Sequence, residues 1–320
     1  MDPLSQVLSL LKPHSYKCGG MDIGGSLSVR FSKHEGIKCY AVVHGQGWLS
    51  IEGIPDPVRL ETGDCFLLPR GEPFRLGSDL TSTPIDAMTL LANKKNGGIG
   101  KINGGGDYMI VGGHFVFSGN AEFLLNALPP IVHLQKEPDK AALRWSLDRM
   151  MEELRDPQPG SSLVAEHLAH MMLVQALRLY LAGGLKGSSG WLYALADPQM
   201  STAIGSMHDD PARRWTVEEL AARAGMSRSI FAAKFKETVG DSPMEYLTRW
   251  RMLLAEEKLA STSDSISGIA RSLGYESQSA FTKAFKRTMG CAPRQRNRIP
   301  APSTRESVGT IESRLEHAAG

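Results

Sequence analysis

Ten side chains in the C-terminal third of the chain could contact the bases and phosphates of a nucleic acid. They fall on two segments, residues 227–240 and 277–290, whose starts lie fifty residues apart. The ten are Arg228, Ser229, Ala232, Ala233, Lys236, Gln278, Ser279, Thr282, Lys283 and Lys286. Glutamine can form two hydrogen bonds with adenine, arginine and lysine can bind guanine or phosphate, and small side chains allow close approach to a thymine methyl group. These residue types suit double-stranded DNA.

Two pairs of phenylalanines predict which elements hold those side chains at the surface. Phe231 and Phe235 are four residues apart, and so are Phe281 and Phe285. On a helix, residues at this spacing lie on one side, and such an aromatic stripe faces a core. The opposite side of each helix would then be exposed, with its first turns free to enter a groove of DNA.

The two segments are copies of one small unit, because seven of their fourteen positions are identical. In each copy an alanine on the preceding short helix (Ala221 or Ala270) is followed four residues later by a glycine (Gly225 or Gly274). The alanine lets two helices cross closely, and the glycine allows the tight turn between them. This is the arrangement of a helix-turn-helix unit. Two such units could fill successive major grooves, about 10 base pairs apart.

Short strands and then two long helices are predicted ahead of these units. From about residue 26 to residue 117, β-branched and aromatic runs alternate with turn residues, as in a barrel or sandwich. Amphipathic helices follow at residues 139–154 and from Ser161 to Ala182, and apolar residues nearly encircle the second one. It is either the central helix of one domain, or it lies between a barrel and a second subunit. We favour the second interpretation, a homodimer through this helix.

Composition and charge exclude several classes of protein. Residues are 42% hydrophobic and 22% charged, an ordinary globular balance. No apolar stretch is long enough to span a membrane, and the N-terminus lacks the features of a signal peptide, so we expect a cytoplasmic protein. The four cysteines have no spacing typical of zinc or disulfide frameworks. Residues 191–298 carry 16 Lys and Arg against 12 Asp and Glu, which permits an anionic partner.

Residues 191–298 resemble the DNA-binding domain of AraC/XylS-type transcription regulators, in which a linking helix holds two helix-turn-helix units. The resemblance is carried by "WTVEELAARAGMSRSIFAAKFKETVGDSPMEYLTRWRMLLAEEKL" and "SISGIARSLGYESQSAFTKAFKRTMGCAPRQRNR". It implies that seven of the predicted positions touch promoter DNA: Arg228, Ser229, Ala232, Ala233, Gln278, Ser279 and Lys283. Ala232 and Ala233 stand where longer polar residues often occur in the family, so we expect the second unit to contribute more to base recognition.

The stretch "GDCFLLPRGEPF", residues 63–74, resembles the second motif of cupins, with Phe74 where the family has a metal-binding histidine. The paired histidines and glutamate of the first cupin motif are not visible between His34 and Gly53, so we expect no metal and no other cofactor. The resemblance implies a cupin-type domain that binds a small-molecule effector or helps to form a dimer. Candidate effector-binding residues are Tyr40, His44, Trp48, Arg70, Phe74 and Met88.

Together these patterns predict an α+β protein of two domains. The N-terminal cupin-like β-barrel and its helical dimerisation segment would span residues 1–182. A linker would span residues 183–196, the all-α double helix-turn-helix domain residues 197–300, and a disordered tail residues 301–320. We expect a transcription regulator, an activator rather than an enzyme, that responds to an effector. Two alternatives stay open: a barrel that only dimerises and, with less support, a metal-dependent cupin enzyme with a DNA-binding appendage.

Overall fold

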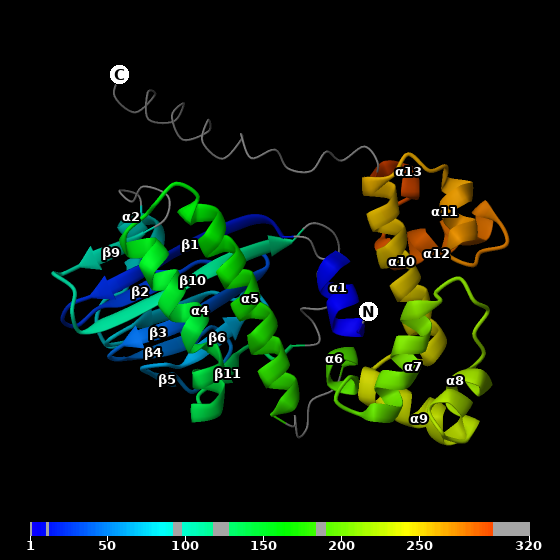
Figure 1. Ribbon diagram of the computed structural model, residues 1–320, viewed down its shortest axis with the longest axis horizontal. Coiled ribbons are helices and arrows are strands. Elements are labelled where there is room, and N and C mark those ends of the chain that lie inside the picture. Colours follow the sequence, from blue (N-terminus) through cyan, green and yellow to red (C-terminus); the bar gives the residue numbers. More distant parts are fainter. Residues whose placement is uncertain (1, 11–12, 92–97, 118–127, 184–189, 297–320) are drawn as a thin grey trace.

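The computed structural model shows two domains that lie side by side, joined near the N-terminal helix (Figure 1). It describes residues 2–10, 13–91, 98–117, 128–183 and 190–296. The predicted tail and residues 184–189 of the predicted linker lie outside the described residues. The domain boundaries predicted from the sequence therefore stay predictions in those parts.

The N-terminal domain contains two β-sheets that lie face to face. Its strands are β1 (Pro13–Ile23), β2 (Ser28–Phe31), β3 (Ile37–His44), β4 (Gln46–Ile51), β5 (Val58–Glu61), β6 (Cys65–Leu68), β7 (Phe74–Gly77), β8 (Ile85–Asp86), β9 (Ile99–Ile102), β10 (Tyr108–Phe117) and β11 (Val132–Leu134). One sheet has the strand order β11-β6-β3-β10-β1-β9 and the other β5-β4-β7-β2-β8. Within the described residues no ladder joins the two sheets, so this part of the domain is a two-sheet sandwich, and closure of the predicted cupin-like barrel stays a prediction.

Side-chain alternation on β3 shows which face of the six-stranded sheet meets the other sheet. Tyr40 and Val42 pack among the apolar residues between the two sheets. Cys39 and Ala41 point the other way, into a core that the sheet shares with helices. The sequence predicted these two faces but left open which one is internal. Large side chains, namely Tyr40 and the aromatic rings of the opposite sheet, fill the space between the two sheets.

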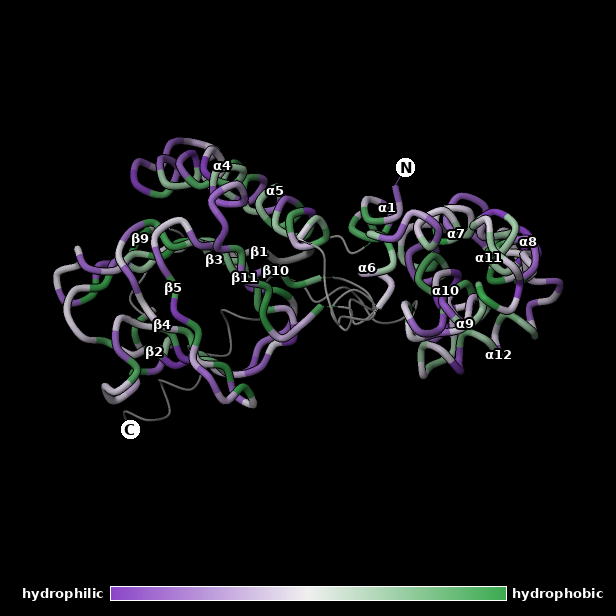
Figure 2. Tube along the Cα trace, turned by 90° about the horizontal axis from the view of Figure 1, so that it is seen from below, coloured by the Kyte–Doolittle hydropathy of each residue, from purple (hydrophilic) through white to green (hydrophobic). Residues whose placement is uncertain are grey.

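Two long helices cover the outer face of the six-stranded sheet (Figure 2). They are α4 (Glu137–Arg155) and α5 (Ser161–Ala182), which pack side by side, while the short α2 (Ala87–Leu91) lies beside β2. Leu173 and Leu177 of α5 are buried against the sheet, whereas Leu163 is 57% exposed and Val164 38% exposed. Trp145 on α4 is 65% exposed. Three large apolar side chains of this helical pair are therefore uncovered in the single chain.

The C-terminal domain is helical throughout its described part. Its helices are α6 (Trp191–Ala194), α7 (Pro198–Asp209), α8 (Val217–Arg223), α9 (Arg228–Val239), α10 (Pro243–Ser261), α11 (Ile266–Ser272), α12 (Gln278–Met289) and α13 (Pro293–Arg296). The sequence placed residues 191–194 in a linker, but Trp191 is only 3% exposed and α6 packs against α9. Burial of its apolar side chains makes α6 part of this domain.

The N-terminal helix α1 (Pro3–Leu10) packs on the C-terminal domain, beside α7 and α10. Val7 is 1% exposed. The Gln6 side chain donates a hydrogen bond from Nε2 to Asp209 Oδ1 (3.2 Å), and its Oε1 lies 3.0 Å from His208 Nδ1. The first residues of the chain thus bind a domain that begins almost two hundred residues later.

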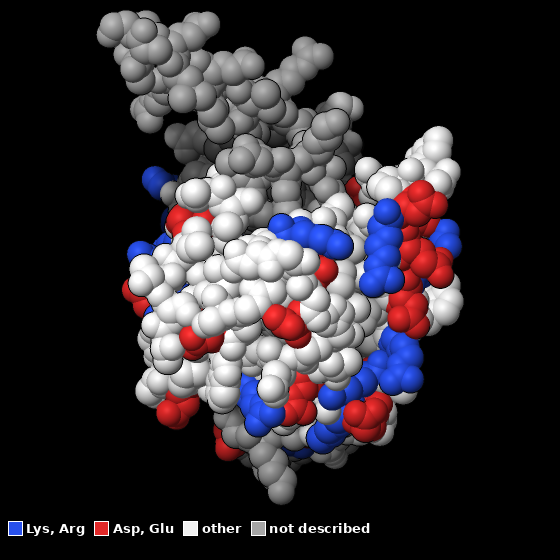
Figure 3. Space-filling model, turned by 90° about the vertical axis from the view of Figure 1, so that its left-hand side faces the viewer, with Lys and Arg blue, Asp and Glu red and all other residues white. Residues whose placement is uncertain are grey.

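Surface charge differs from place to place on the molecule. On the end of the N-terminal domain that faces away from the helical domain, basic and acidic side chains occur next to one another (Figure 3). Because opposite charges lie next to one another there, the face seen in this view offers no field of positive charge to a polyanion.

No helix in the described ranges has the length and apolar character needed to cross a lipid bilayer.

Candidate nucleic-acid interface

The same local signals begin and end the two recognition helices, α9 and α12. Ser227 and Ser277 are the N-caps, and each side chain accepts a hydrogen bond from a backbone N–H of the first turn. Gly240 and Gly290 end the helices in the left-handed conformation, with φ of 91° and 75°. Glycine takes this conformation without steric cost. Identical caps therefore give both copies the same length and the same start.

Both phenylalanine pairs lie in the core, as the spacing predicts. Phe231, Phe235, Phe281 and Phe285 are all 0% exposed. The ring centroids are 5.5 Å apart in the first pair and 5.7 Å apart in the second. Replacing one such ring by alanine costs about 3–5 kcal/mol in folding free energy. These pairs fix the rotation of each helix about its axis and leave the opposite side outward.

That outward side, which we call the recognition face, consists of the ten predicted side chains. On α9, Arg228, Ser229, Ala233 and Lys236 are exposed and Ala232 is half-buried; on α12, Gln278, Ser279, Lys283 and Lys286 are exposed and Thr282 is half-buried. The five α12 side chains also line one shallow hollow in the surface. The structure therefore brings together the five predicted residues of the second unit in one concave site.

Each recognition helix follows its partner helix through a turn that needs glycine. Gly225 between α8 and α9 has φ of 66°, and Gly274 between α11 and α12 has φ of 79°. A Cβ at Gly274 would lie 2.2 Å from the carbonyl oxygen of Ala212, whereas one at Gly225 would meet nothing within 4 Å. The second turn is thus packed against the first unit as well as being left-handed.

Contacts between the two units fix their relative placement. Arg251 of the linking helix α10 donates hydrogen bonds to the carbonyl oxygens of Pro211 (2.6 Å) and Arg213 (2.9 Å). Arg214, in the loop before α8, forms an ion pair with Glu276, in the turn before α12. These contacts run from the segment before α8 to the linking helix and to the turn before α12, and so they help to set how the two units lie against each other.

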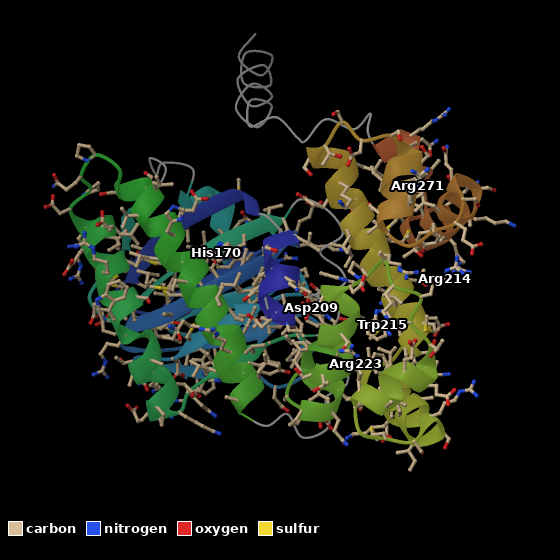
Figure 4. All side chains as sticks on the ribbon, turned by 45° about the vertical axis from the view of Figure 1, so that its right-hand side comes forward. His170, Asp209, Arg214, Trp215, Arg223 and Arg271 are labelled. Atoms are coloured by element: carbon tan, nitrogen blue, oxygen red, sulfur yellow. The ribbon has the colours of Figure 1, made fainter. Side chains whose placement is uncertain are left out.

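Further basic side chains lie near the recognition helices and were missed by the sequence analysis. Figure 4 shows Arg214, Arg223 and Arg271 on the C-terminal domain, with Trp215 beside Arg223. The guanidinium carbons of Arg213 and Arg223 lie 4.4 Å and 5.1 Å from the Trp215 ring centroid. The charge excess of this domain was the available signal, but it does not say which cations lie near α9 and α12.

One apolar side chain on α9 was also missed. Ile230 is 60% exposed, an unusual place for a β-branched residue. It lies in the first turn of the helix, next to Ser229. An apolar contact with a thymine methyl group is one chemistry that such a residue can provide.

Comparisons with known proteins agree with this geometry. Residues 2–182 match the Cupin family model and residues 220–298 match that of the helix-turn-helix domain. The chain is 44% identical over 295 residues to a putative AraC-like transcription regulator of Streptomyces lividans, covering 92% of this chain and 97% of that protein. The chain belongs to the AraC family of transcription regulators. The family predicted from the sequence is confirmed, and with it a regulator rather than an enzyme.

Two further comparisons concern this AraC-family chain. A putative AraC-like transcription regulator of Streptomyces antibioticus is 43% identical over 304 residues, which cover 94% of this chain and all of that protein. A solved structure, the DNA-binding domain of the global transcriptional factor AdpA in complex with a target DNA, is 26% identical. It covers 39% of this chain and 99% of that chain, with a TM-score of 0.30.

The six predicted effector-binding residues do not form one cluster in the cupin domain. Phe74 is buried between the sheets, and Tyr40 points to the same interior. Trp48 is 39% exposed and Met88 is 72% exposed. The exposed Arg70 donates two hydrogen bonds to the Leu128 carbonyl, and the His44 side chain, 40% exposed, lies 3.9 Å from Asp22. Tyr40 and Phe74 are the two that face a common interior.

The cupin metal position is apolar in this chain. Phe74 stacks on Phe31, with ring centroids 4.5 Å apart and planes 5° from parallel. In the part of the chain that the structure describes, no three His, Cys, Asp or Glu residues lie close enough together to hold a metal ion. The donor set that a cupin metal requires is therefore not assembled by the described residues.

Proposed function

We propose that this regulator binds promoter DNA through the recognition faces of α9 and α12 and activates transcription in response to a small molecule bound by its cupin domain. The observation that carries the DNA-binding part is the burial of both phenylalanine pairs, because it leaves the opposite side of each recognition helix outward. We place this activity in the cytoplasm, where chromosomal DNA is accessible.

We assign most of the base recognition to α12. Its face carries Gln278, a bidentate partner for adenine, and Lys283, which can bind guanine or phosphate. The corresponding stretch of α9 offers the methyl groups of Ala232 and Ala233, which limits it to close apolar contacts. Arg228 and Lys236 on α9 would mainly contact phosphates and position the protein.

A homodimer through α5 is the assembly that we propose. Leu163 and Val164 at the start of α5, together with Trp145 on α4, are apolar and exposed in the single chain. Contiguous exposed apolar groups are typical of a protein interface, and we propose that these three side chains belong to one. A second copy of the same face would cover them by two-fold symmetry.

The helix α1 is the described element through which the N-terminal segment reaches the DNA-binding domain. Its Gln6 contacts both His208 and Asp209 at the end of α7. An effector alters DNA binding only if it binds two arrangements of the protein with unequal affinity. We propose that the docked and undocked positions of α1 are two such arrangements.

The DNA-binding part is tested by mapping the bound genomic sites and then measuring affinity for one site by fluorescence anisotropy. We expect Gln278→Ala and Lys283→Ala each to weaken binding by about 1–3 kcal/mol where a base contact is lost. If Lys283 contacts a phosphate instead, its variant lowers the slope of log affinity against log salt by about 1. Lys101→Ala, an exposed lysine in the cupin domain, is the matched control. Unchanged affinity and footprint for both α12 variants would refute the assignment.

A further inference from the structure

A lysine lies between the two sheets of the cupin domain. Lys38 on β3 is only 8% exposed. Its Nζ lies 4.6 Å from the Phe31 ring centroid and 4.8 Å from the Phe74 ring centroid, and both rings belong to the opposite sheet. Lysines are almost never this deeply buried unless they are paired. The position therefore calls for a partner.

The described residues supply no anion to this ammonium group. Lys38 forms no ion pair with a described carboxylate, and burial alone lowers its pKa to about 8. At neutral pH the side chain thus keeps its charge, at a cost that comes from lost hydration. The two aromatic rings offset part of that cost through their negative faces. No described carboxylate offsets the rest.

A histidine beside Lys38 also has unused hydrogen-bonding capacity. Both ring nitrogens of His34, in the connection between β2 and β3, are buried and lack a partner in hydrogen-bond geometry. Its ring centroid lies 6.0 Å from that of Phe74 and 5.4 Å from that of His114. Burial, followed by the positive charge of Lys38 and then His114, lowers the pKa of His34 to about 4, which a contribution from the Leu68 carbonyl only partly opposes. A neutral imidazole therefore lies near this ammonium group, and its ring nitrogens have no described partner in standard hydrogen-bond geometry.

The surroundings of this pair are apolar and lie at one end of the sandwich. Phe31 and Phe74 are directly opposite each other in the β2–β7 ladder. The backbone N–H of His34 donates to the carbonyl of Gly71 (3.0 Å), which joins the β2–β3 and β6–β7 connections. A molecule that reaches Lys38 between these connections would place its polar end on the two nitrogenous side chains and its body among aromatic and aliphatic groups.

Building on the effector response proposed above, we propose that the effector is a small organic acid. Its carboxylate would bind Lys38 Nζ and a ring N–H of His34, and its apolar body would lie against Phe31, Phe74 and the residues between the sheets. One ammonium and one neutral donor match a single negative charge. A phosphate monoester carries nearly two charges and three acceptor oxygens, for which this pair provides too few donors.

Binding is tested by calorimetry on the full-length protein with hexanoate and benzoate as probes. The neutral isosteres 1-hexanol and benzyl alcohol, and inorganic phosphate, are the comparison ligands. We expect at least one of the two carboxylates to bind, the alcohols to bind far more weakly, and Lys38→Met to weaken carboxylate binding by about 10- to 100-fold, as for a lost charge-assisted hydrogen bond. Lys33→Met, an exposed lysine five residues earlier, should bind as the wild type does.

The unliganded protein gives a second readout that separates a ligand site from a structural brace. A ligand-binding lysine is a burden without its ligand, so Lys38→Met should raise the melting temperature while Lys33→Met leaves it unchanged. A fall in the melting temperature of Lys38→Met would mean that the ammonium holds the two rings together, and would overturn the proposal. The same holds if neither carboxylate binds, if the alcohols or phosphate bind as well as the carboxylates, or if Lys38→Met retains full carboxylate affinity.

The proposed function is checked separately on the same preparations. Wild type and Lys33→Met are titrated with a mapped promoter site and with an unrelated duplex, both without carboxylate. Failure to distinguish the two duplexes would refute the regulator proposal but leave the carboxylate result standing. Specific DNA binding without carboxylate binding would refute the organic-acid proposal alone.

Discussion

His208 should lower the free energy of unfolding of the C-terminal domain in mild acid, because its imidazole is buried. The imidazole is 5% exposed, and its ring stacks on Trp250 with centroids 3.7 Å apart. Its Nε2 lies 2.8 Å from Tyr246 Oη and its Nδ1 lies 3.0 Å from Gln6 Oε1. Because the Gln6 amide nitrogen donates to Asp209, its oxygen faces His208 and accepts a hydrogen bond from the Nδ1–H group. Nε2 is then the acceptor for the tyrosine hydroxyl.

Burial lowers the pKa of His208 from 6.5 to about 3. At pH 5 the unfolded chain therefore binds a proton at this residue that the folded domain does not bind. The neutral His208 therefore stabilises the folded domain fully at pH values above its unfolded-state pKa of 6.5, and this stabilisation is lost as the pH falls below that value. Between about pH 7.5 and pH 5 the free energy of unfolding should fall by about 2 kcal/mol from this residue, a value set by the distance of pH 5 from the unfolded pKa.

The variant His208→Phe keeps an aromatic ring beside Trp250 but cannot titrate. It should be less stable than the wild type at pH 7.5, because the Tyr246 hydroxyl loses its acceptor, and should lose about 2 kcal/mol less on acidification. Urea unfolding followed by tryptophan fluorescence measures both, and His167→Gln, an exposed histidine on α5, is the control. His34 is unchanged in both proteins, so its contribution cancels. If the His208 imidazole itself titrated near pH 6.5 in NMR spectra of the wild type, identified as the signal that His208→Phe removes, the reasoning would be refuted.

Two further outcomes follow from the fold and the proposed assembly. Gly274→Ala should destabilise the C-terminal domain by about 1–3 kcal/mol more than Gly225→Ala, since both force alanine into a left-handed turn but only the first meets the Ala212 carbonyl. Thermal unfolding monitored by circular dichroism compares the two variants. Equal losses of stability in both would contradict the contact. Leu163→Glu should convert a dimer to a monomer in analytical ultracentrifugation while Arg144→Glu, exposed on α4, does not, because only the first places a charge in the proposed apolar interface.

Local patterns in the sequence were enough to predict the helix-turn-helix units. The phenylalanine spacing and the turn glycines of both copies act over fewer than fifteen residues, and the structure has each of them. The five α12 side chains could be placed together for the same reason. Helix α6 was missed because Trp191 is held by α9, a contact that no local pattern in a glycine-rich stretch reveals.

Contacts between distant segments could not be predicted. Nothing in the composition of residues 3–10 indicates that they pack on α7, and alternation along β3 does not say which face is internal. Lys38 passed unnoticed because a single lysine in a strand is normally solvated; only the position of the Phe31 and Phe74 rings makes it buried. Trp48 and Met88 were candidates for a pocket by residue type alone, and their positions on β4 and α2 leave both side chains at the surface.

The docking of α1 has a practical consequence for dissecting this protein. A fragment that starts at Gly190 would retain both recognition helices but would bare the apolar surface that Leu4, Val7 and Leu8 cover in the intact chain. The apolar face of α1 thus covers part of a domain that follows the entire cupin domain in sequence. Fusion of residues 2–10 to such a fragment, rather than a simple cut at the boundary, is the natural minimal design.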